Sequence, residues 1–172
     1  MSMKAVRLSL SAFLLFLCSP PYPAQEIETE NIPNEILQAV ELGPFAQSYV
    51  IDGSMNPFYL RGDFDGDGKA DYALRVKSKG HGEVGIAIWL SSQKKVVLLG
   101  AGTPFRVSAA ATSNLDFLNT WQVYAKGPVE RGVGSGPPPH LVGDALLVGK
   151  RESASGLIYW NGKSFVWYQQ GD

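Results

Sequence analysis

Residues 58–77 read FYLRGDFDGDGKADYALRVK, and this stretch decides how the chain is expected to fold. Residues 58–61 are aromatic and aliphatic enough to predict a short β-strand. In residues 72–77, side chains alternate between two faces, with Tyr72, Leu74 and Val76 on one of them, which predicts a second strand. The segment between the strands is acidic, so the sequence predicts a strand-loop-strand unit.

The acidic loop has the composition of a calcium site. Four carboxylates lie within residues 63–71, and such crowding of like charge is costly unless a cation lies among them. Hard oxygen ligands at this density select Ca²⁺. We expect the side chains of Asp63, Asp65, Asp67 and Asp71 and the backbone carbonyl of Lys69 to bind the ion.

The loop begins like an EF-hand but does not continue as one. Asp63, Asp65, Asp67 and Gly68 match the first half of that loop, but its last position, which requires a bidentate glutamate, holds Leu74. A strand rather than a helix is expected to follow. The prediction is therefore a strand-loop-strand calcium site, not a helix-loop-helix sensor.

Residues 62–72, GDFDGDGKADY, resemble the calcium motif of the FG-GAP and VCBS repeat families. That resemblance implies a loop that clamps two strands. Those families usually carry several copies as propeller blades, whereas this chain has one copy and is too short for a propeller of several blades. The chain is also similar to small exported bacterial proteins of uncharacterised function, which carry one such loop and end in a Trp-Asn-Gly-Lys-type hairpin, here residues 159–163.

The first 24 residues are typical of a secretory signal peptide. Lys4 and Arg7 supply the positive start, and residues 8–18 form an apolar segment too short to cross a bilayer comfortably. We expect cleavage after Ala24 and a periplasmic or secreted protein, with lipid attachment at Cys18 as the alternative. No later segment is apolar enough to predict a membrane span.

Composition limits the number of domains, the partners and the cysteine chemistry expected for the exported part, residues 25–172. Its length suits a single domain. Without Lys4 and Arg7 the acidic residues outnumber the basic ones, and no basic patch is present, so we do not expect nucleic acid as a partner. Cys18 is the only cysteine, so its removal with the signal leaves neither disulfides nor cysteine chemistry.

Local patterns predict an α+β fold: a mostly antiparallel sheet with one N-terminal helix. The helix is expected at residues 31–42, with Ile36, Leu37 and Val40 on its apolar face and Gly43-Pro44 ending it. Further strands are expected at residues 84–90, 96–99, 121–125, 145–148, 157–160 and 163–168. Residues 105–120 are ambiguous, with residues 105–107 as a candidate strand and little pattern in residues 108–114.

The last two strands are expected to form a hairpin. The dipeptide at 161–162, Asn-Gly, suits a two-residue type I′ turn. That turn would pair Ile158 with Phe165 and set Trp167 opposite Gly156, where the ring could fill the space that glycine leaves. Because both faces carry large apolar groups, the hairpin is expected to lie centrally, with the helix covering one face.

The remaining candidate residues favour binding over catalysis. His81 and His140 lie in separate polar segments with no second ligand or acid/base partner at suitable spacing. Residues 127–143 are rich in Gly and Pro, and a loop of this length is functional or mobile. The tryptophans are more typical of core packing than of a sugar-binding platform, with Trp89 as the exception to examine.

The sequence therefore predicts an exported, non-catalytic calcium-binding protein whose metal is structural and whose surface binds a protein or a cell-envelope ligand. Two alternatives remain open. The chain could be a periplasmic inhibitor or immunity protein that inserts the 127–143 loop into a partner's active site. It could also be a cell-wall-directed hydrolase, which would require an acid/base pair outside the acidic loop.

Overall fold

The structure, a computed structural model, describes residues 27–41, 43–132 and 136–171. The predicted signal peptide, which includes Cys18, and Leu42 lie outside these residues. Helical segments open the described part of the chain: η1 (Thr29–Asn31), α1 (Asn34–Glu41) and α2 (Pro44–Ser48). The strands are β1 (Tyr49–Ile51), β2 (Tyr59–Gly62), β3 (Asp71–Ser78), β4 (Val84–Leu90), β5 (Lys95–Gly100), β6 (Phe105–Val107), β7 (Ala110–Thr112), β8 (Thr120–Tyr124), β9 (Ala145–Gly149), β10 (Ser155–Trp160) and β11 (Phe165–Gly171).

These strands form two antiparallel sheets and a separate hairpin. In the first sheet the strand order is β1-β3-β4-β5. Strands β1 and β2 pair with the same edge of β3, β2 with its first half and β1 with its second half. The second sheet has the order β11-β10-β9-β8, and β6 pairs with β7 alone. The expected β-rich, antiparallel class is thus confirmed. The expected helix forms as α1, while α2 was not predicted.

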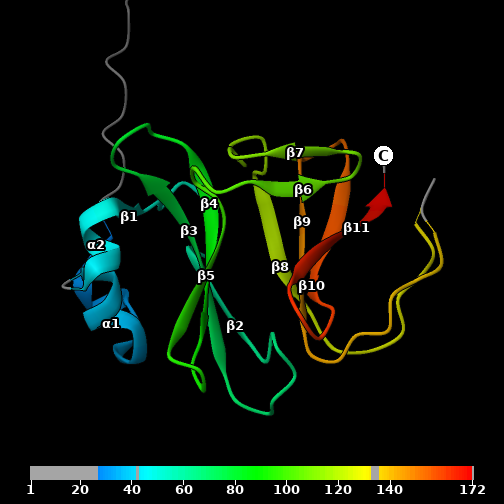
Figure 1. Ribbon diagram of the computed structural model, residues 1–172, viewed down its shortest axis with the longest axis horizontal. Helices are drawn as coiled ribbons and strands as arrows, with labels where there is room; N and C mark the ends of the chain where they lie inside the picture. Colours follow the sequence, from blue (N-terminus) through cyan, green and yellow to red (C-terminus); the bar gives the residue numbers. More distant parts are fainter. Residues whose placement is uncertain (1–26, 42, 133–135, 172) are drawn as a thin grey trace, which may run out of the picture.

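Alternation along β3 and β4 determines how the layers pack. One face of the first sheet, with Leu74 and Val76, packs against the helices, where Ile36 is fully buried. The other face, with Ile86, Ile88 and Leu90, packs against the second sheet. The main core therefore lies between the two sheets, and Figure 1 shows the helices on the far side of the first sheet from the second.

The outer face of the second sheet is covered by described residues of the long segment that joins β8 to β9. Val129 and Leu141 of this segment are buried against Leu157 and Tyr168. The hydroxyl of Tyr168 accepts a hydrogen bond from the amide of Gly132 (3.2 Å). The expectation that the helix covers the C-terminal hairpin was wrong, because the helices pack on the first sheet instead (Figure 1).

The predicted register of the C-terminal hairpin was also wrong, by two residues. Trp160 pairs with Phe165, and Ile158 pairs with Trp167. The connection consists of residues 161–164 rather than a two-residue turn. A shift of two residues leaves every side chain on its predicted face, because side chains in a strand alternate with a period of two.

Side-chain hydrogen bonds explain the wider turn. The Oδ1 atom of Asn161 accepts hydrogen bonds from the amides of Lys163 and Ser164, each 2.9 Å long, and these bonds close a four-residue connection. The Trp167 ring still covers Gly156, where an added Cβ would collide with the indole. The predicted filling of the glycine gap is therefore confirmed, although the two residues are diagonal rather than paired.

Arg75 of β3 is a buried cation, 5% exposed, at the edge of the core between the sheets. Its Nε donates to Oδ2 of Asp52 (2.7 Å), and its Nη1 donates to the carbonyl of Leu118 (2.6 Å). Burial raises the pKa of Asp52, but hydrogen bonds from Arg75 and Ser54 and the charge of Arg75 outweigh it and hold that pKa below its usual range. One guanidinium thus joins three separate segments of the chain.

Within the described ranges, no helix combines the length and the apolar character that crossing a membrane requires.

Candidate metal site

The acidic loop closes the open end of the β2–β3 pair. Gly62 pairs with Asp71 at the last register position, and residues 63–70 connect them at the lower edge of the molecule in Figure 1. Asp63, Asp65 and Asp71 each direct a carboxylate oxygen to one place, and these oxygens all lie within 4.8 Å of one another. This group of three aspartates could hold a metal ion.

Asp63 organises the loop from its first position. Its Oδ1 accepts a hydrogen bond from the amide of Gly66 (2.9 Å), and its Oδ2 accepts one from the amide of Gly68 (3.0 Å). Both glycines have positive φ, +80° and +86°, a conformation that favours glycine. Because a carboxylate has about four lone-pair sites, Asp63 keeps capacity for a cation after accepting these two bonds.

Asp71 is the buried member of the group, 1% exposed. Its oxygens accept hydrogen bonds from the amides of Phe64 (3.0 Å) and Ser91 (2.9 Å). Burial raises the pKa of Asp71 and the charge of Asp65 adds to it, although these amide bonds act in the opposite direction. A negative charge on Asp71 is costly because this side chain is buried and lies near another carboxylate. A cation between the carboxylates would offset that cost.

Asp67, the fourth predicted side-chain ligand, lies apart from the other three aspartates. Asp67 is exposed and is not part of the converging group. A hydrogen bond from the Ser92 side chain, followed by one from the Lys69 amide (2.8 Å), lowers the pKa of Asp67. The predicted role of the Lys69 carbonyl stays a prediction.

The acidic loop also contacts the second sheet, and the sequence contains no local pattern that predicts this contact. The amide of Asp63 donates to Oδ2 of Asp144 (3.0 Å), and the amide of Asp144 donates to the carbonyl of Asp63 (2.7 Å). The Oδ1 of Asp144 accepts a third bond, from the amide of Lys126 (2.9 Å). A Cβ at Gly143 would collide with the Asp63 carbonyl, so the two backbones touch. Asp144 therefore fixes the loop to the start of β9.

A second set of contacts fixes the loop to the β4–β5 turn. The Ser91 hydroxyl donates to the carbonyl of Ala70 (2.6 Å), and Nε2 of Gln93 donates to Oδ2 of Asp65 (2.9 Å). With the Ser91 amide bond to Asp71, the turn holds the loop at three points. The aspartates are thus positioned by contacts from both sheets.

We predict different costs for alanine at the two loop glycines. Gly68→Ala should lose about 1–2 kcal/mol, because alanine must adopt a left-handed backbone while its Cβ meets nothing within 4 Å. Gly66→Ala should lose roughly 1–3 kcal/mol more, because its Cβ would also collide with the Val142 carbonyl. Urea unfolding of both variants measures the difference. Equal losses would contradict close docking of the loop on residues 142–143.

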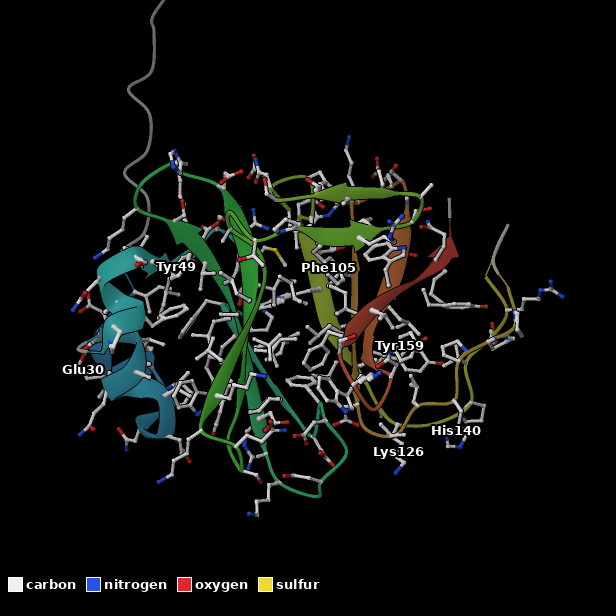
Figure 2. The ribbon with its side chains drawn as sticks, in the orientation of Figure 1. Glu30, Tyr49, Phe105, Lys126, His140 and Tyr159 are labelled. Carbon is white, nitrogen blue, oxygen red and sulfur yellow. The ribbon has the colours of Figure 1, made fainter. Side chains whose placement is uncertain are left out.

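The two histidines lie apart from the aspartates. His81 and His140 are both exposed, and neither belongs to the converging group. Figure 2 shows His140 on the segment that covers the outer face of the second sheet. Within the described residues, the aspartates at 63, 65 and 71 are the one His/Cys/Asp/Glu group with metal-binding geometry.

Comparison of the chain with protein-family models, curated proteins and solved structures gave no match in any of the three. The resemblance of residues 62–72 to FG-GAP and VCBS calcium loops therefore stays a prediction.

Proposed function

We propose that this is an exported, non-catalytic calcium-binding protein in which Ca²⁺ has a structural role and the surface binds another molecule. The observation that supports it best is the convergence of Asp63, Asp65 and Asp71 within 4.8 Å. Only oxygen atoms converge, and oxygen is the ligand type that Ca²⁺ prefers. Export is proposed from the signal-like first 24 residues.

A structural role is favoured by the position of the loop. Asp144 fixes it to the second sheet, and Ser91 and Gln93 fix it to the first. An ion at this junction would offset the repulsion among carboxylates in a region where both sheets meet. Since the loop is held on two sides, binding would stabilise one arrangement rather than switch between two.

Asp65→Ala should abolish calcium binding. Asp65 is the best position for the test because it is only partly buried, whereas Asp71 is buried and its loss would also disturb folding. Calorimetry on the form that begins at Gln25 measures the affinity. Glu30→Ala is the matched control, because it removes one exposed carboxylate outside the loop and should leave the affinity unchanged.

A melting experiment tests the structural role in the same samples. At free calcium about a hundredfold above the dissociation constant, linkage adds roughly 2.7 kcal/mol of stability. A chelator should then lower the melting temperature of the wild type by several degrees and leave that of Asp65→Ala unchanged. Unchanged calcium affinity in Asp65→Ala, or a wild-type melting temperature that ignores the chelator, would refute the proposal.

A further inference from the structure

A cavity between α1 and the first sheet combines an aromatic ring with unpartnered polar side chains. Its volume is about 580 Å³. The helix contributes carboxylate and amide groups, and the strands and the β4–β5 turn contribute aromatic and cationic groups. The charged, amide and aromatic side chains in its lining are those of Glu35, Gln38, Arg61, Tyr72, Trp89 and Lys94.

Strand register places three of these residues in one row. Arg61 of β2 pairs with Tyr72 of β3, and Tyr72 pairs with Trp89 of β4. Paired residues of neighbouring strands lie on the same face, so the row faces the helices. Tyr72 is 4% exposed, whereas Trp89 is only partly buried. The indole of Trp89 is therefore the aromatic surface within reach of a ligand, and Arg61 lies at the exposed end of the row.

The polar groups around this ring are free to bind. Among the residues that the structure describes, the side chains of Glu35, Gln38, Arg61, Lys94 and Trp89 have no hydrogen-bond or ion-pair partner. Glu35 and Gln38 are three positions apart on α1 and thus neighbours on its surface. The lining offers two cations, one carboxylate and one amide beside an indole.

One wall of the cavity is held in place by the acidic loop. Ala70 and Ser91 both line the cavity, and they are joined by the hydrogen bond from the Ser91 hydroxyl to the Ala70 carbonyl (2.6 Å). The turn that carries Lys94 is thereby fixed to the strand that follows the loop. A wall that is formed in advance lowers the entropy that a ligand must lose on binding.

We propose that this cavity binds an acidic saccharide, that is, a sugar ring that carries a carboxylate. The apolar C–H face of such a ring packs on the indole of Trp89, because the tryptophan ring offers a large apolar surface and its N–H remains available for a hydrogen bond. Arg61 and Lys94 bind the carboxylate through charge-assisted hydrogen bonds, and Glu35 and Gln38 bind ring hydroxyls. An acidic saccharide is thus the ligand for the binding surface of the proposed function, and the inference rests on that proposal only for the existence of such a surface. It does not depend on the calcium site, because neither Asp63 nor Asp65 lines the cavity.

The test follows the indole N–H signal of Trp89 by NMR, assigned with Trp89→Phe. Three probes are titrated at the same free calcium: trigalacturonate, its fully methyl-esterified form, and inorganic sulfate. We expect trigalacturonate to shift the signal with an affinity at least on the order of tenfold above that of either other probe. No shift, or an equal affinity for the ester or for sulfate, would overturn the proposal.

Two charge variants locate the contact. Arg61→Gln should weaken trigalacturonate binding about tenfold without lowering the melting temperature, because the Arg61 side chain is exposed. Lys163→Gln, in the exposed β10–β11 turn, is the matched control and should bind normally. Unchanged affinity in Arg61→Gln, or equal loss in the control, would contradict the assignment. Calcium affinity is measured separately by calorimetry, so failure of the calcium proposal is distinguished from failure of this one.

Discussion

Replacing Arg75 by methionine is expected to lower the free energy of unfolding by about 3–5 kcal/mol, because it leaves a partly buried carboxylate without its cation. Methionine preserves most of the volume of the arginine stem, so packing changes little. What is lost is the ion pair with Asp52 and the hydrogen bond to the Leu118 carbonyl. The contact with Asp116 (3.3 Å) should contribute little, because that side chain is largely exposed. Urea unfolding at pH 7 measures the loss.

The dependence on pH distinguishes the ion pair from packing. Since the pKa of Asp52 is lowered in the folded protein, its contribution is present above the unfolded pKa of about 3.9 and is lost as the pH falls through the folded value. The difference between wild type and Arg75→Met should therefore shrink below about pH 4. Asp52→Asn combined with Arg75→Met should cost less than the sum of the two single changes. Additive losses at all pH values would contradict the pairing.

Local periodicity predicted the strands where both faces are apolar. The strand expected at residues 84–90 is β4, and in the structure its alternate residues face the two layers. The prediction succeeds because a strand that is buried on both faces is apolar along its whole length, and its own residues are enough to show this. Ala110–Thr112 (β7) was missed, since three small residues of a hairpin carry no such pattern.

Long-range packing could not be read from these patterns. Arg75 lies on the predicted face of β3, but nothing in residues 72–77 indicates that this face meets a second sheet. Its partners lie 23 and 43 residues away, at Asp52 and Leu118. The hairpin register failed for a related reason, because the Asn161 side chain stabilises a four-residue turn that the dipeptide rule does not include.

The same limit applies to the candidate metal site. Asp63, Asp65 and Asp71 could be expected to meet, because they belong to one tight loop with glycines at the required positions. Asp144, which fixes that loop, is 81 residues from Asp63. In the sequence, Asp144 appears only as part of a Gly-Asp pair at the end of the 127–143 segment. That pair does not predict a contact with the acidic loop, because the contact depends on how the two sheets pack.

Replacing Phe64 by alanine is expected to lower the free energy of unfolding by about 3–5 kcal/mol and to weaken calcium binding as well. Phe64 lies between two of the aspartates, yet its side chain is fully buried in the core that both sheets share. Its ring packs against Gly62, and its amide donates to Asp71. Removing the ring leaves a cavity beneath the loop, so the carboxylates lose the support that positions them.

Phe105→Ala separates the effect on the loop from the general loss of core packing. Phe105 is buried in the same core, but it lies on β6 at the opposite end of the molecule from the acidic loop (Figures 1 and 2). Both variants should lose similar stability in urea, because both remove one buried aromatic ring. Calorimetry well below the melting temperatures should find calcium affinity lowered in Phe64→Ala and unchanged in Phe105→Ala. If both variants bind calcium equally well, the ring of Phe64 supports the core and not the carboxylates of the loop.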